Sequence, residues 1–89
     1  MSWYLVDQPD GRFARYDNED DLFTLYNMSE GMVLGWAIRF WGFTLPEIRS
    51  LIVSARQAGR ARWLDALFLI EEHHEHLGLE IMLERMGID

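Results

Sequence analysis

The feature that most constrains the fold of this chain is the segment from Thr44 to Gly87, which opens with a complete helix-start signal. Thr44 and Glu47, three residues apart, form a predicted capping box, and Pro46 is tolerated in a first helical turn. Apolar residues then recur three and four positions apart, at Leu45, Ile48, Leu51, Ile52 and Ala55. This spacing predicts a helix with one buried stripe.

A second long helix is predicted after Gly59, which we expect to break the first one. It should run from about residue 61 to residue 77, and its centre, residues 66–70, is apolar on every side. Such a pattern is typical of a helix buried among others. Gly78 is expected to end this helix, and residues 79–86 are expected to form a last short one.

The first 17 residues have a pattern typical of a β-hairpin. Residues 2–7 are rich in aromatic and β-branched side chains, and residues 12–17 alternate between polar and apolar. Between them, Gln8-Pro9-Asp10-Gly11 has the composition of a turn. An isolated hairpin is marginal in water, so it must pack on the helices or gain another strand.

Two further helices are predicted between the hairpin and Thr44. Asn18 can cap the first, and Asp21 can reach back to it. The apolar side of this helix would be Leu22, Phe23, Leu25 and Tyr26. Ser29 can cap the second, and Gly42 supplies its end. The apolar side of that helix would be Met32, Val33, Trp36, Ala37 and Phe40.

The sequence therefore predicts one α+β domain over residues 1–89, with helix dominant. In this prediction an N-terminal β-hairpin (residues 1–17) packs on a bundle of four to five helices (residues 18–89). The net charge of −7 disfavours direct binding to nucleic acid. The chain has no cysteine, no signal peptide and no membrane-spanning run, so we expect a cytoplasmic protein.

The run Glu71-Glu72-His73-His74-Glu75-His76 has residue types that bind metals. Glu71 and His74 form a Glu-x-x-His pair, but di-iron bundles need two such pairs and two more glutamates. His74 also continues an apolar stripe, which indicates a core or interface histidine with a satisfied ring nitrogen. Nucleophile elbows and phosphate-binding glycine loops are absent. We therefore predict no metal, no cofactor, no catalytic residue and no enzymatic activity.

The three arginines around Gly59 allow two interpretations. Arg56, Arg60 and Arg62 could contact phosphates or the carboxylates of a partner. Alternatively, they lie near a helix C-terminus, where cations are favoured by the helix dipole. The second interpretation is the simpler one.

Two segments resemble known proteins. Residues 38–51, which include Gly-Phe-Thr-Leu-Pro-Glu-Ile, resemble a segment of MerR-type regulators, but the helix-turn-helix that should precede it is missing. The opening Trp-Tyr-Leu-Val-Asp-Gln-Pro-Asp-Gly-Arg-Phe-Ala-Arg-Tyr of residues 3–16 is similar in style to small bacteriophage proteins. In size, charge and layout the chain also resembles anti-CRISPR and other phage inhibitors of host machinery. This resemblance implies a protein-binding role and transfers no functional residue.

The leading hypothesis is a non-enzymatic binding protein, which occludes a basic, nucleic-acid-binding surface of a host protein complex. Acidic side chains would provide electrostatic complementarity, and exposed aromatic side chains would anchor the interface. The predicted partner-binding residues are Asp17, Glu19, Asp20, Asp21, Trp41, Phe43, Glu71, Glu72 and Glu75. The alternatives are a homo-oligomeric helical module, such as a homodimer, and a small transcriptional regulator.

Overall fold

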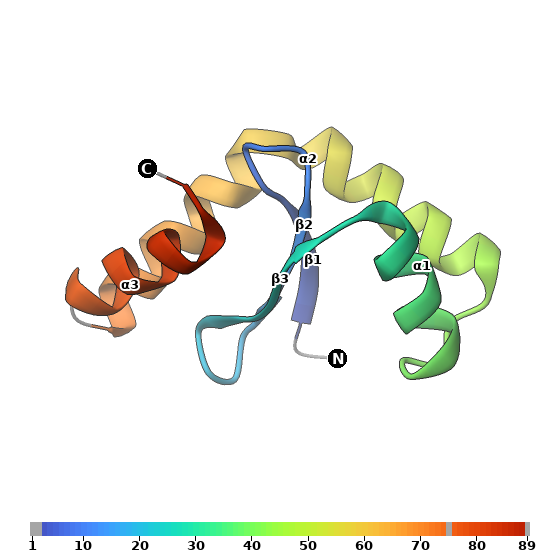
Figure 1. Ribbon diagram of the computed structural model, residues 1–89, viewed down its shortest axis with the longest axis horizontal. Coiled ribbons are helices and arrows are strands. Elements are labelled where there is room, and N and C mark those ends of the chain that lie inside the picture. Colours follow the sequence, from blue (N-terminus) through green and yellow to red (C-terminus); the bar gives the residue numbers. More distant parts are fainter. Residues whose placement is uncertain (1–2, 75, 89) are drawn as a thin grey trace.

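The structure is a computed structural model that describes residues 3–74 and 76–88. These residues form the strands β1 (Trp3–Asp7), β2 (Phe13–Asp17) and β3 (Leu22–Met28), and the helices α1 (Glu30–Arg39), α2 (Leu45–His73) and α3 (His76–Met86). The strands make one antiparallel sheet in the order β1-β2-β3. Helix α2 forms an arch over the sheet, with α1 below one end of the arch and α3 below the other (Figure 1).

The fold is α+β, but the predicted bundle of four to five helices is wrong, because the described residues contain three helices and a third strand. Residues 18–28, predicted as helical, form a turn and β3. The Asp17 side chain accepts a hydrogen bond from the Glu19 amide at 2.9 Å, and Asp21 has a positive φ of 51°. Residues of the kind that cap helices also form such turns, and the local sequence does not choose between the two. The added strand completes the marginal hairpin.

The β1–β2 hairpin is confirmed, with a regular register from Trp3 opposite Asp17 to Asp7 opposite Phe13. Its turn is closed by the backbone N–H of Gln8, which donates to the Arg12 carbonyl at 2.8 Å. The β2–β3 register is less regular, with shifts on both sides of Arg15.

The sheet separates two hydrophobic cores. Side chains alternate between the faces of a strand, so neighbouring residues of β1 enter different cores. The α1-side core contains Leu5, Phe13, Met28, Val33, Ala37, Ile48, Ile52 and Ala55. The α3-side core contains Val6, Ala14, Tyr16, Phe23, Trp63, Ala66, Ile70, Leu79 and Met86. Helix α2 contributes to both cores and packs along β1, the edge strand between them.

Helix α2 reaches both cores because it bends at Gly59. The backbone of this glycine has φ 49° and ψ −130°, a conformation in which a Cβ atom is strained. The sequence predicted a break here between two helices. The structure shows a kink instead, and helical structure continues directly on its other side.

The boundary between α2 and α3 lies earlier than predicted. Helix α2 ends at His73, and Gly78, which was expected to end it, lies inside α3. The backbone of His74 is extended, and its ring Nε2 lies 3.0 Å from the carbonyl oxygen of Asp20. No local pattern in the sequence indicates this contact with the β2–β3 turn. The helix end predicted from the sequence alone was therefore wrong.

The helix-start signals at Ser29 and Thr44 are confirmed, whereas the one at Asn18 is wrong. Ser29 Oγ accepts from the Met32 amide at 3.2 Å at the start of α1. At the start of α2, Thr44 Oγ1 accepts from the Glu47 amide at 3.4 Å, while the Thr44 amide donates to Glu47 Oε1 at 2.9 Å. None of the helices over the described residues combines the length and the apolar character that crossing a bilayer requires.

Candidate functional site

The acidic residues predicted to bind a partner gather at one end of the molecule. The β2–β3 turn lies against the C-terminal end of α2, where Asp20 contacts His74 and Asp21 Oδ2 lies 3.7 Å from His73 Nε2. We call this region the acidic end, and it consists of Asp17, Glu19, Asp20, Asp21, Glu71 and Glu72. Glu75, also predicted as partner-binding, lies outside the described residues. Two segments about fifty positions apart in the sequence thus form one surface.

A buried tyrosine holds the turn of the acidic end in place. The Tyr16 hydroxyl donates a hydrogen bond to Asp21 Oδ1 at 3.0 Å, and Tyr16 itself lies in the α3-side core. Burial and this bond to a carboxylate both raise the pKa of Tyr16 above its ordinary value of 10.0. The Tyr16 hydroxyl therefore stays neutral and donates its hydrogen bond to Asp21. The side chains of Glu19, Asp20, Glu71 and Glu72 are exposed at the surface.

The aromatic residues predicted to bind a partner lie in another part of the molecule. Trp41 and Phe43 are half-buried, and their rings lie 5.0 and 5.9 Å from the ring of Trp3. The Arg15 guanidinium covers the Trp3 ring at 4.7 Å and the Trp41 ring at 5.4 Å. We call these four residues the aromatic cluster. It adjoins the acidic end at one point, because Trp3 lies opposite Asp17 in the β1–β2 pairing.

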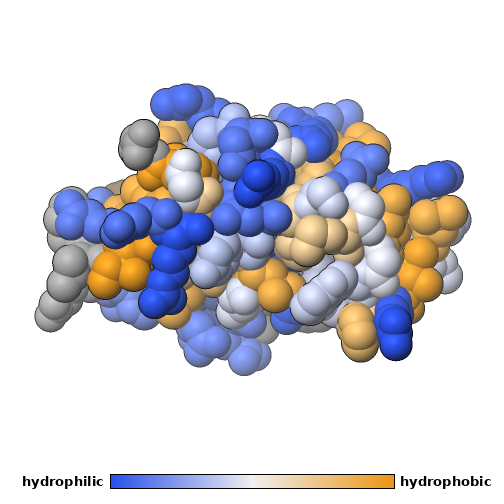
Figure 2. Space-filling model, in the orientation of Figure 1, coloured by the Kyte–Doolittle hydropathy of each residue, from blue (hydrophilic) through white to orange (hydrophobic). Residues whose placement is uncertain are grey.

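The predicted partner-binding residues leave out Phe40, one of the most exposed aromatic side chains of the described residues. Phe40 is 64% exposed and packs edge-on against Trp36, which is 39% exposed. With Met32 they form a stripe along one flank of α1, while Val33 and Ala37 are buried. Hydrophobic residues gather over α1 and the start of α2 at the right-hand end of Figure 2. The spacing 32–36–40 is visible in the sequence, but only packing decides which flank is buried.

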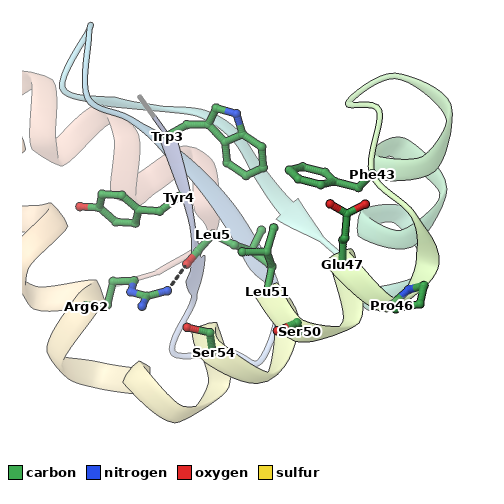
Figure 3. A pocket seen from close by; sticks show the side chains of 10 residues that line it. All are labelled: Trp3, Tyr4, Leu5, Phe43, Pro46, Glu47, Ser50, Leu51, Ser54 and Arg62. Atoms are coloured by element: carbon green, nitrogen blue, oxygen red, sulfur yellow. Dashed lines mark hydrogen bonds between the residues drawn. The ribbon is translucent and has the colours of Figure 1, made fainter. Parts of the chain in front are cut away.

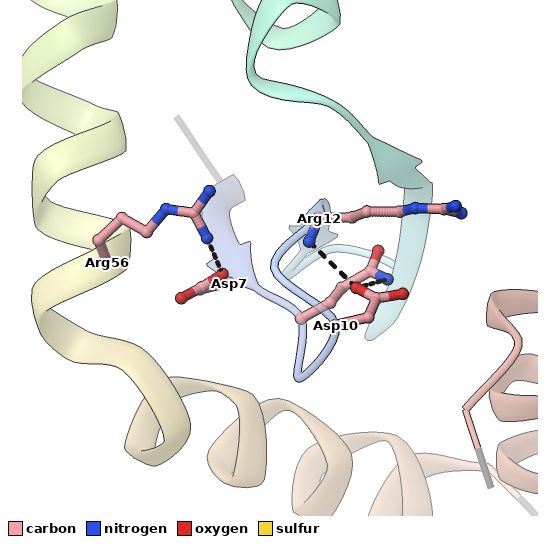
Figure 4. A network of polar contacts seen from close by, with 5 residues as sticks. Asp7, Asp10, Arg12 and Arg56 are labelled. Atoms are coloured by element: carbon pink, nitrogen blue, oxygen red, sulfur yellow. Dashed lines mark hydrogen bonds and ion pairs between the residues drawn. The ribbon is translucent and has the colours of Figure 1, made fainter.

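Two of the three arginines around Gly59 bind other parts of the chain. Arg56 pairs with Asp7 at the end of β1 (Figure 4). Arg62 Nη1 donates to the Leu5 carbonyl at 3.0 Å. Helix α2 as a whole continues to His73, but its helical geometry is interrupted at Gly59, so Arg56 lies in the last turn before that interruption. These arginines attach the bent part of α2 to the edge strand.

A hollow of about 630 Å³ lies between β1 and the first half of α2 (Figure 3). Its lining is largely apolar and aromatic, with a carboxylate at one end and a guanidinium at the other. The lining residues are Trp3, Tyr4, Leu5, Phe43, Pro46, Glu47, Ser50, Leu51, Ser54 and Arg62. Phe43 is thus the predicted partner-binding residue that lines this hollow.

Metal-binding groups do not converge in the part of the chain that the structure describes. Across residues 3–74 and 76–88, no three His, Asp or Glu side chains are placed so that they could hold an ion. Comparison of the chain with protein-family models, with curated proteins and with solved structures found no match.

Proposed function

We propose that this chain is a small, acidic, non-enzymatic binding protein of the cytoplasm, which occludes a basic, nucleic-acid-binding surface of a host protein complex. The observation that carries the proposal is the meeting of the β2–β3 turn with the end of α2, through Asp20 and His74 at 3.0 Å. This contact joins two acidic segments into one surface. The resemblance to small phage inhibitors is the reason for placing the partner in a host complex.

The distribution of charge supports this proposal. Residues 1–30 carry seven acidic residues against two arginines, and residues 71–89 carry six against one. Arg56 and Arg62 are bound to β1, away from the acidic end. Complementary charge accelerates association, and its effect is screened by salt. A basic groove on a partner is the surface that such an end would recognise.

The test is a displacement assay. The immobilised protein captures candidate partners from a bacterial lysate, and each purified partner is then bound to its own fluorescent nucleic acid. We expect the wild-type protein to displace the nucleic acid, with an affinity that falls as ionic strength rises. The double variant Asp20→Asn, Glu72→Gln should displace it at least about thirtyfold less well, because each of the two removed contacts to a charged group costs about 1 kcal/mol or more.

A control variant loses the same charge elsewhere. Glu30 in α1 and Glu84 in α3 are exposed and lie outside the acidic end, so Glu30→Gln, Glu84→Gln should displace nucleic acid as well as the wild type. Equal loss in both double variants would mean that net charge alone is responsible. The proposal would be contradicted if displacement did not depend on ionic strength, or if no displacement occurred.

Self-association is a second candidate function, favoured by the exposed stripe on α1. Met32, Trp36 and Phe40 are 47%, 39% and 64% exposed on one flank of the helix. Aromatic residues of this kind dominate interfaces. Sedimentation equilibrium of the wild type and of Phe40→Ser decides this candidate. A dimer that Phe40→Ser converts to a monomer supports it, and a wild-type monomer at tens of micromolar excludes it.

A further inference from the structure

We propose that the hollow beside β1 binds a short extended peptide of a partner protein, which pairs with the outer side of β1 and places a carboxylate at Arg62. None of the residues that line this hollow belongs to the acidic end, so the inference does not depend on the proposed function. A volume of about 630 Å³ lies within the usual range for ligand sites, about 300–1,000 Å³.

The backbone of β1 is suited to a peptide because this strand lies at the edge of the sheet. The Gln8 amide bonds to the Arg12 carbonyl, which fixes the alternation of the hairpin. The backbone groups of Tyr4 and Val6 therefore hydrogen-bond to β2, while those of Trp3 and Leu5 point away from it. Because the Leu5 carbonyl is already bonded to Arg62, the peptide would pair with the backbone groups of Trp3 and the amide of Leu5. An extended peptide is the ligand whose own amides and carbonyls complement such an edge.

Helix α2 covers one part of this edge and leaves the other part beside the hollow. Near the end of β1, Arg56 holds the Asp7 side chain and Arg62 holds the Leu5 carbonyl (Figures 3 and 4). Trp3, Tyr4 and Leu5 line the hollow. A full sheet from a second copy would have to pass α2, whereas a single short strand needs only the open part.

The walls of the hollow indicate the side chains of the peptide. The Trp3 ring is fixed between Arg15, Trp41 and Phe43, and together with Leu51 it forms an apolar wall. Because these contacts already hold the ring, the wall is formed before a ligand binds, which lowers the entropic cost of binding. An apolar side chain of the peptide fits this wall.

The charge at the end of the hollow indicates the rest of the ligand. A guanidinium has five N–H donors, and the described structure gives Arg62 one hydrogen bond, to the Leu5 carbonyl, and no ion pair. Glu47 lies at the opposite end, where its Oε1 accepts from Thr44. A carboxylate beside Arg62 is therefore favoured, and one beside Glu47 is disfavoured.

The experiment uses a displayed library of random linear peptides selected on the full chain. We expect the selected peptides to share an apolar residue near an Asp or Glu, and to shift the amide resonances of Trp3 and Leu5. Replacing the acidic residue of the peptide by its amide should weaken binding about tenfold to hundredfold, the cost of a hydrogen bond to a charged group. N-methylation of the peptide at alternate residues should abolish binding, and at the intervening residues should not.

A matched pair of arginine variants tests the protein side. Arg62→Gln should weaken peptide binding about tenfold or more, whereas Arg60→Gln, on the same helix but outside this hollow, should not. The amide variant of the peptide gives the same information on the wild-type protein if Arg62→Gln fails to fold. Peptides that lack an acidic residue, binding that tolerates N-methylation everywhere, or shifts confined to α1 would each overturn the proposal. So would equal effects of the two arginine variants.

Discussion

The two sides of the sheet are built from different side chains and carry different surfaces. The α3-side core is rich in aromatic residues, with Phe23 stacked on Trp63 at 5.4 Å and Tyr16 beside them, and the acidic end lies at its edge. The α1-side core is largely aliphatic, with Phe13 as its one buried aromatic residue, and other aromatic residues on this side are partly exposed, around the hollow and on α1. The difference teaches that one helix, α2, builds two distinct surfaces because Gly59 bends it around the edge strand.

The largest effect is expected from Trp63→Ala in the α3-side core. Trp63 is 4% exposed, and removing such a side chain costs about 3–5 kcal/mol through lost burial and a cavity. Chemical denaturation measures this loss of stability, and hydrogen exchange shows which backbone amides lose protection. If the sheet separates the cores, amides of α1 should lose less protection than amides of α3. An equal loss of protection in α1 and α3 would show that the two cores unfold as one unit. Leu64→Ala, at an exposed site of α2, is the control.

The next effect tests the bend that connects the two sides. Gly59→Ala places a Cβ on a backbone at φ 49° and ψ −130°, and we expect a loss of about 1–3 kcal/mol in unfolding free energy. Gly35→Ala, inside α1, should instead stabilise by about 0.5–1 kcal/mol, because alanine is the better helix former. Thermal unfolding of both variants gives the comparison, and equal values would argue against strain at Gly59.

Tyr16→Phe tests the link between the α3-side core and the acidic end. It removes the hydrogen bond to the Asp21 carboxylate, with an expected loss of about 1.5 kcal/mol near neutral pH. The pKa of Tyr16 is higher in the folded state than its ordinary 10.0, so this stabilisation is complete below pH 10.0 and is lost as the pH rises further. Stability measured against pH should fall less steeply above this value in Tyr16→Phe. Parallel curves would count against the link.

The smallest effect is expected at the start of α2, on the α1 side. Thr44→Ala removes the cap of this helix and should cost about 1 kcal/mol in unfolding free energy. Hydrogen bonds from Thr44 lower the pKa of Glu47 below its ordinary 4.5. The contribution of Glu47 is therefore complete above pH 4.5 and is lost as the pH falls below it. Denaturation at neutral and acidic pH measures the cost of losing the cap and the pH-dependent contribution of Glu47. The loss of stability on acidification should be smaller in Thr44→Ala than in the wild type.

Local signals in the sequence placed several elements correctly. The turn after Gln8, the caps at Ser29 and Thr44, and the interruption of helical geometry at Gly59 all depend on a few neighbouring residues. The two acidic segments of the candidate site were also visible as composition. Their meeting was not, because it depends on contacts between the β2–β3 turn and the end of α2.

The amino-acid sequence by itself determined the hairpin, the helix starts at Ser29 and Thr44, the high negative charge and the glycine at the bend. Tertiary structure alone decided that residues 22–28 form a strand, that α2 continues past Gly59 and ends at His73, and which aromatic side chains are exposed. The physical reason is that caps and turns are satisfied by hydrogen bonds between near neighbours. Strand pairing, helix ends held by a distant carbonyl, and burial of one flank of α1 depend on groups far apart in the chain.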